Sequence, residues 1–154
     1  MIQVTASEEC EVWVSQINRP FEVLSPFCGD DFALMLVIAD PTIATVERAA
    51  VSTEIVRQGC RYAVCTGYEC SQWDDSIDYA FLATSPNFSP PDDRFVMTTW
   101  HEGESLEEVT EWFRWSTTFQ DFVPRRFLVL LLGGDRSMVD TVDAAVEKWF
   151  GPLQ

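Results

Sequence analysis

Two side chains of this sequence, those of His101 and Cys70, are of the types used in nucleophilic catalysis. A cysteine at the start of a helix has its thiolate favoured, and a nearby imidazole could serve as its base. No catalytic sequence pattern surrounds either residue, however, and Cys70 begins the apolar side of its expected helix. A turn histidine that hydrogen-bonds a carboxylate, such as that of Glu102, is the simpler explanation of His101. We therefore expect a structural role for the histidine and no catalytic pair.

Acidic side chains follow the expected strands at their carboxyl ends, where ligands collect in open α/β sheets. The residues expected along this rim are Asp40, Glu69, His101, Glu102 and Asp135. Carboxylate oxygens that converge on one edge could bind a hard cation such as Mg²⁺ or Ca²⁺. Acidic residues at helix amino ends also complement the helix dipole without any ligand, and we favour this second interpretation. A ligand or metal site at the rim remains the alternative, and no cofactor is expected.

Nucleotide binding has no support in the turns of the sequence. The turn after the first apolar strand reads ADPTIA and contains a carboxylate instead of the glycines that let a backbone approach pyrophosphate. The glycine pair Gly133-Gly134 is followed by Asp135, which fits a helix-entry turn better than a phosphate cradle. Lys148 lies far from any glycine-rich turn, so a P-loop is excluded as well.

The segment EEVTEWFRWSTTFQDF, residues 107–122, is unusually aromatic. At helical spacing, Val109 and Phe113 form one apolar stripe. A second stripe, rotated away from the first, is flanked by glutamates. The residues of this second group are Trp112, Trp115 and Phe119 with Glu107, Glu108 and Glu111. They could pack against a neighbouring helix, or they could form an aromatic anchor with an acidic rim for a protein partner.

These residues would be positioned by four apolar strands that alternate with four amphipathic helices. The strands are expected at 32–39, 61–67, 94–100 and 125–133. The helices are expected from the N-cap Asp40 to the stop at Gly59, over 70–81, from the capping residues Ser105 and Glu108, and over 139–149. This alternation predicts an α/β protein, a three-layer α/β/α domain with a mainly parallel sheet of four to five strands. We favour the flavodoxin-like order 2-1-3-4, because it places the most apolar strand in the middle.

The amino-terminal segment does not follow this alternation. EVWVSQI, residues 11–17, alternates like a half-buried strand and is expected to add an edge strand, for which an antiparallel arrangement is open. Residues 18–31 are expected to form an ordered loop held by Phe21, Leu24 and Phe27. We expect one domain over 1–154, in which 1–31 supplies the edge strand and this loop.

The charge balance restricts the partners of the chain. Twenty-five acidic residues oppose 10 basic ones, which gives a formal net charge of -15 and a pI near 4.2. Such a field repels nucleic-acid phosphates and anionic lipid, so neither nucleic acid nor a membrane is expected as a partner. A basic protein would be attracted, although high charge also serves solubility alone.

The cysteines favour a reducing compartment. Their number is odd and no C-x-x-C pair occurs among Cys10, Cys28, Cys60, Cys65 and Cys70. The start of the chain lacks the pattern of a signal peptide, and the longest apolar run is too short for a bilayer. We expect a non-enzymatic cytoplasmic protein that binds a basic protein partner, as an immunity, inhibitor or regulatory protein would. The alternative is a small enzyme or a ligand-binding domain that uses the rim.

Overall fold

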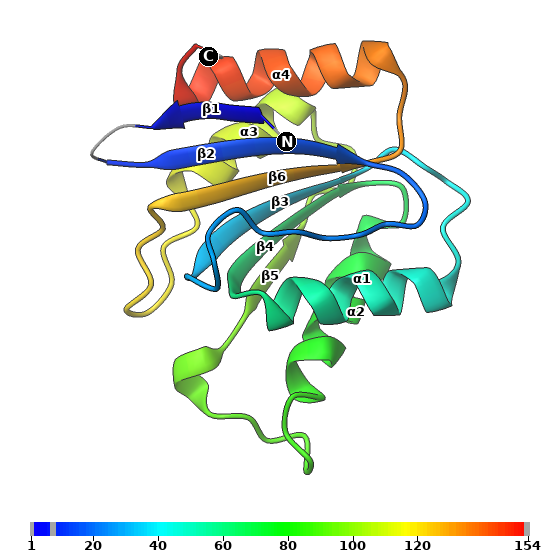
Figure 1. Cartoon of the computed structure of the whole chain (residues 1–154), viewed down its shortest axis with the longest axis vertical. Coiled ribbons are helices and arrows are strands. Elements are labelled where there is room, and N and C mark those ends of the chain that lie inside the picture. The colour runs from blue at the N-terminus through cyan, green and yellow to red at the C-terminus, as the bar shows by residue number, and fades with distance from the viewer. Residues whose placement is uncertain (1, 7–8, 153–154) are drawn as a thin grey trace.

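The computed structural model describes residues 2–6 and 9–152, which form three layers with a six-stranded sheet in the middle (Figure 1). The order across the sheet is β1-β2-β6-β3-β4-β5. Five strands run parallel, and β1 is antiparallel to β2. The predicted α/β class and three-layer architecture are confirmed. The strands are β1 (Ile2–Ala6), β2 (Glu11–Ile17), β3 (Phe32–Ile38), β4 (Cys60–Gly67), β5 (Met97–Trp100) and β6 (Arg126–Leu132).

Four helices cover the two faces of the sheet (Figure 1). Helices α1 (Thr45–Arg57) and α2 (Cys70–Leu82) lie on one face. Helices α3 (Leu106–Trp115) and α4 (Arg136–Phe150) lie on the other. A short 3₁₀ turn, η1 (Asp92–Arg94), precedes β5. Within the described part of the chain, no helix combines the length and the apolar character that crossing a bilayer requires.

The central strands β3 and β6 explain why the sheet needs helices on both sides. Every residue of β3 is buried, and its side chains alternate between the two faces. Leu34 and Leu36 pack with α1 and α2, whereas Met35 packs with α3 and α4. Because both faces of these strands are apolar, each face must be covered to remove it from water.

The strand order differs from the flavodoxin-like order that the sequence favoured. The most apolar strand, β3, does lie in the interior of the sheet, but its second neighbour is β6 and not β5. The burial of the two strands gives the physical reason. From Phe127 to Leu132, β6 is fully buried, whereas β5 has only four residues, all of them partly or fully exposed. The weaker strand therefore takes the edge.

The amino-terminal prediction also requires correction. Strand β2 runs parallel to β6 and lies one position inside the edge, which is formed by the additional strand β1. The loop over 18–31 is ordered as expected, and Phe27 is buried within it. Leu24, however, is 62% exposed, and Val23 is the neighbouring side chain that enters the core.

The helix boundaries follow their capping residues. Helix α1 begins at Thr45 and not at Asp40, because the carboxylate of Glu47 accepts the N–H of the N-cap Ala44. The predicted capping box of Ser105 and Glu108 is confirmed at α3. The side chain of Asp135 caps α4 by accepting the N–H of Met138 at 2.9 Å. Helix α3 ends at Trp115, so the aromatic residues beyond it leave the helical spacing.

Candidate functional site

The rim at the carboxyl ends of the strands is organised by Arg19, a residue that sequence reasoning did not place there. Its guanidinium contacts the carboxylates of Asp40 at 3.1 Å and Glu47 at 2.8 Å. It also donates to the carbonyl of Thr42 at 2.9 Å. Arg19 follows β2, and because β2 is parallel, its carboxyl end lies at the same edge as that of β3. The cation therefore neutralises the carboxylates that were expected to face a ligand.

The predicted rim carboxylates are engaged within the chain. The side chain and backbone N–H of Thr42 hydrogen-bond to Asp40 and, with Arg19, hold the pKa of that carboxyl below its ordinary value. Glu69 pairs with Arg48 at 3.1 Å, and Asp135 caps α4. Glu102 is exposed at the other end of the rim. The five rim residues are thus brought to one edge of the sheet but do not converge on a common point.

We expect the Arg19→Gln variant to unfold about 1 to 3 °C below the wild type at neutral pH. The pKa values of Asp40 and Glu47 are lowered, so their contribution is present at neutral pH and is lost as the pH falls through those lowered values. The difference between the two proteins should therefore shrink below about pH 4. Thermal unfolding across this pH range measures it. Arg136→Gln is the control, since that arginine is 87% exposed, and an equal loss there would contradict the prediction.

His101 lies in the turn between β5 and α3 and contacts a carboxylate other than that of Glu102. It is 6% exposed, and its Nδ1 lies 2.9 Å from a carboxylate oxygen of Glu104, not of Glu102. Its Nε2 lies 3.0 Å from the hydroxyl of Thr99. The imidazole also packs on the indole of Trp112, with ring centroids 5.4 Å apart. Both ring nitrogens are occupied, so the histidine fixes the turn between β5 and α3.

Cys70 and His101 approach each other without forming a nucleophile and base. Strands β4 and β5 are neighbours, and the backbone N–H of His101 donates to the carbonyl of Cys65 at 3.0 Å. Burial raises the pKa of the Cys70 thiol, and this effect exceeds the opposing backbone hydrogen bond from His101. The two imidazole nitrogens contact Thr99 and Glu104, and burial disfavours the thiolate of Cys70.

A hollow of about 320 Å³ opens next to this histidine, between the edge strand β5 and helix α3. The side chains at its sides are aromatic and partly exposed: Trp100 is 54% exposed and Trp112 is 40% exposed. Glu104 contributes a carboxylate to the same lining. Trp100 was not among the predicted site residues, because a tryptophan at the end of a strand reads as part of the core. Only its position on an edge strand leaves it exposed.

The aromatic residues predicted on α3 have different surroundings. Trp115 is 63% exposed, and the guanidinium of Arg114 lies over its ring at 4.2 Å. Phe119 lies beyond the helix and packs on Phe95 with ring centroids 5.4 Å apart, so it is part of the interior. Of the predicted aromatic stripe, Trp112 and Trp115 therefore remain at the surface.

The three predicted glutamates of α3 also separate into distinct roles. The carboxylate of Glu107 is paired with Lys148 of α4. Glu108 accepts the N–H of Ser105 within the capping box. Glu111 is exposed, and among the described residues its carboxylate has no ion-pair or hydrogen-bond partner. Its charge is therefore available to an external group.

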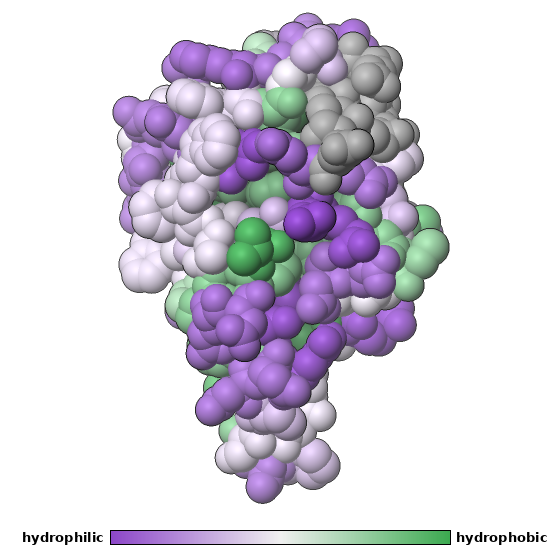
Figure 2. Space-filling model, turned by 90° about the vertical axis from the view of Figure 1, so that its left-hand side faces the viewer, coloured by the Kyte–Doolittle hydropathy of each residue, from purple (hydrophilic) through white to green (hydrophobic). Residues whose placement is uncertain are grey.

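Much of the positive charge gathers at the opposite end of the sheet. Figure 2 shows this face, at the amino ends of the parallel strands, where hydrophilic side chains surround a few hydrophobic ones. Arg61 is buried here and bonds Asp31 at 3.1 Å and the carbonyl of Phe95 at 3.1 Å. This end of the sheet has a pocket of about 300 Å³. Four of the ten basic residues of the chain lie around it: Arg61, Arg94, Arg125 and Arg126. The region around β5 and α3 is left predominantly acidic.

A family model described as a domain of unknown function, DUF7684, matches residues 7–149. The chain belongs to the DUF7684 family. The matched region of this DUF7684 protein runs from before β2 to the last turn of α4, so it includes the β2–β6 pairing and the hollow beside His101. No curated protein and no solved structure matches the chain. Since the family description states no activity, the function of this DUF7684 protein has to be inferred from its surface.

Proposed function

We propose that the chain is a non-enzymatic binding protein that takes up a basic segment of a protein partner between β5 and α3. The surface that we assign to this role, called the aromatic–acidic surface, consists of Trp100, Trp112, Trp115, Glu104, Glu108 and Glu111. The observation that carries the proposal is the hollow beside His101, which lies between two partly exposed tryptophans and includes the carboxylate of Glu104.

The exposed tryptophans give the strongest support for a binding surface. Leaving indole rings in water forgoes the free energy of burying them, and tryptophan is enriched at the residues that dominate binding energy. Trp112 is also held rigidly by its contact with the buried His101, so little side-chain entropy is lost when a partner covers it. A ring fixed next to a hollow is therefore ready to receive a side chain.

The charge of the surface selects a basic partner. Arginine and lysine side chains stack on indole rings and pair with carboxylates, and both groups occur here. The free carboxylate of Glu111 lies one position from Trp112 along α3. The formal net charge of -15 would also steer a basic protein towards the chain and speed its association at low salt.

The edge strand β5 supports an extended segment as the bound element. Within the described sheet, β5 is the last strand beyond β4, and its outer side pairs with no further strand. An extended peptide can add to such an edge through backbone hydrogen bonds while its side chains enter neighbouring pockets. The hollow lies beside this edge, since Thr98, Thr99 and Trp100 contribute to its lining.

The cysteines and the acidic surface together support a cytoplasmic role as an inhibitor or immunity protein. Cys28, Cys60, Cys65 and Cys70 are free thiols, which fits a reducing compartment. A protein that neutralises a basic toxin or nuclease would need a compact acidic surface of this kind. Catalysis or ligand binding at the rim has less support, because Asp40, Glu69 and Asp135 already hold partners within the chain.

The test compares captured proteins between site variants and matched controls. Wild-type protein, Trp112→Ala and Glu111→Lys are immobilised beside Tyr79→Ala and Asp140→Lys, which make similar changes on α2 and α4. We expect a basic protein to be retained by the wild type and both controls and released by salt. The Trp112→Ala variant should bind the purified partner about 30-fold more weakly. Glu111→Lys should show a smaller loss that fades at high salt.

Two outcomes would contradict this function. Retention of the same partner by Trp112→Ala at wild-type strength would exclude the aromatic–acidic surface. Binding of a basic partner would be rejected altogether if every protein retained by the wild type were also retained by Trp112→Ala and Glu111→Lys.

A further inference from the structure

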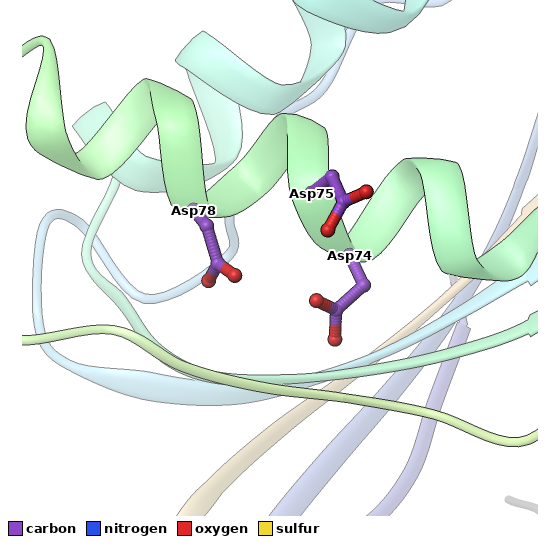
Figure 3. A group of neighbouring side chains, drawn as sticks. All are labelled: Asp74, Asp75 and Asp78. Atoms are coloured by element: carbon purple, nitrogen blue, oxygen red, sulfur yellow. The ribbon is translucent and has the colours of Figure 1, made fainter.

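Helix α2 carries three neighbouring aspartates, Asp74, Asp75 and Asp78, and the first and last of them lie on the side that faces β5. Figure 3 shows Asp74 and Asp78 pointing from the helix towards the strand beneath it. One carboxylate oxygen from each of the three lies within 4.8 Å of the others. Sequence periodicity places these aspartates on the polar face of the helix. The structure instead buries Asp74, which is 4% exposed, while Asp78 is half-buried and Asp75 is exposed.

One oxygen of the buried Asp74 carboxylate lacks a hydrogen-bond partner within the described part of the chain, although the side chain contacts Thr98 and Asp78. Its Oδ2 is buried and, among the described residues, has no hydrogen-bond partner. The hydroxyl of Thr98 on β5 donates to Oδ1 of Asp78 at 2.6 Å. An unsatisfied buried polar atom costs about 1 to 3 kcal/mol, and more when the group is charged. The oxygen therefore points to a partner that the chain does not provide.

The cluster also lacks a balancing positive charge. None of the ion pairs among the described residues includes Asp74, Asp75 or Asp78. The carboxyl groups of Asp74 and Asp78 also contact each other, so two acidic groups lie together without a cation between them. The rim carboxylate of Asp40, in contrast, has its own arginine.

We propose that Asp74, Asp75 and Asp78, with the hydroxyl oxygen of Thr98 beside them, form a site for a hard divalent cation, Ca²⁺ by the spacing of the ligands. Oxygen atoms on opposite sides of Ca²⁺ lie about 4.6 to 5.2 Å apart, whereas those around Mg²⁺ lie about 4.0 to 4.2 Å apart. The separations within the cluster do not exceed 4.8 Å, so the three oxygens fit within the span across Ca²⁺. The cation supplies both the charge and the partner that Oδ2 of Asp74 lacks.

The exposure of the three residues gives the ion a route into the site. Asp75 faces solvent, Asp78 is half-buried, and Asp74 lies innermost. The cation enters past Asp75, and water molecules complete its coordination on the outer side. With three carboxylates from a single helix, we expect a dissociation constant on the order of 10⁻⁴ M. The three carboxylates lie on α2, outside the proposed partner surface, and Thr98 of β5 borders both sites.

The test measures thermal unfolding and calorimetric binding of protein freed of metal by a chelator. We expect 10 mM CaCl₂ to raise the melting temperature of the wild type by several degrees relative to NaCl of equal ionic strength. Asp74→Asn and Asp78→Asn should each bind Ca²⁺ at least tenfold more weakly. Asp140→Asn is the matched control, because it removes one exposed charge on α4 and should respond like the wild type.

The variants remain informative about folding. Asparagine keeps the size of the side chain and removes a buried charge, so Asp74→Asn should be at least as stable as the wild type without metal. The proposal is overturned if Ca²⁺ stabilises the wild type no more than NaCl does. It is equally overturned if Asp74→Asn and Asp78→Asn retain the wild-type response.

Discussion

The Gly67→Ala variant is expected to lose more than about 3 kcal/mol of folding free energy. Gly67 ends β4 with φ +94°, a conformation that side chains rarely adopt. A Cβ atom there would lie 2.2 Å from the carbonyl oxygen of Ile38, which already accepts the N–H of Tyr68 at 3.0 Å. Because that oxygen belongs to the backbone of a central strand, it cannot move away cheaply. Chemical denaturation monitored by circular dichroism measures the loss.

Gly103→Ala is the matched control for backbone strain alone. Gly103 also has a positive φ, +76°, but no atom lies within 4 Å of the position that its Cβ would occupy. We expect a loss of about 1 kcal/mol, the cost of holding alanine in the left-handed region. Similar losses at the two glycines would show that the close approach at Ile38 is not the cause.

The Phe113→Ala variant should lose about 3 to 5 kcal/mol, because it leaves a cavity between α3, α4 and the sheet. The ring is fully buried and meets Phe127 edge-on at 5.2 Å and Phe150 at 5.8 Å. The same ring anchors the helix that carries Trp112. Equilibrium denaturation gives the value, and a loss below about 1 kcal/mol would show that this contact does not hold α3 in place.

Trp112→Ala provides the comparison on the same helix. Its indole is 40% exposed and packs mainly on His101, so we expect a loss of about 1 kcal/mol. Substitutions at the adjacent positions 112 and 113 should thus distinguish an effect on partner binding from an effect on folding stability. A large loss at Trp112 would mean that this tryptophan belongs to the core rather than to the aromatic–acidic surface.

The layered fold could be predicted because the strongest local patterns agree with it. Seven consecutive apolar residues at Phe32–Ile38 require cover on both faces, and Ser105 with Glu108 marks a helix start that depends on nearby residues alone. Strand order depends on which edges meet after chain reversals, and no local pattern encodes that. The sequence therefore predicted the layers but neither the position of β6 beside β3 nor the parallel direction of β2.

Spacing along one helix grouped the aromatic residues of 107–122 but did not decide whether they are buried. Trp112 and Glu111 are exposed in the structure. Phe119 leaves this stripe because the helix ends at Trp115. The role of Arg19 depends on β2 and β3 ending at one edge, a consequence of topology that its neighbours in the chain do not reveal.

The aspartates of α2 illustrate a further limit of periodicity. A helix packed near the edge of a sheet buries a wider face than a single apolar stripe, and Asp74 lies next to Trp73 on that face. A polar residue within reach of the core looks the same in a sequence as one directed to solvent. Its burial and its unpaired oxygen emerge only from the packing of α2 on β5.

The position of β6 determines when the chain can complete its structure during synthesis. Among the described strands it comes last in the chain but third across the sheet, between β2 and β3. Until Arg126–Leu132 is available, the amino-terminal hairpin and the β3–β4–β5 group present unpaired apolar edges to each other. A nascent chain that lacks Arg126–Leu132 therefore exposes two unpaired apolar strand edges. Such edges are prone to aggregate and are the kind of surface that molecular chaperones bind. The two parts of the sheet can therefore join only after Arg126–Leu132 has been synthesised.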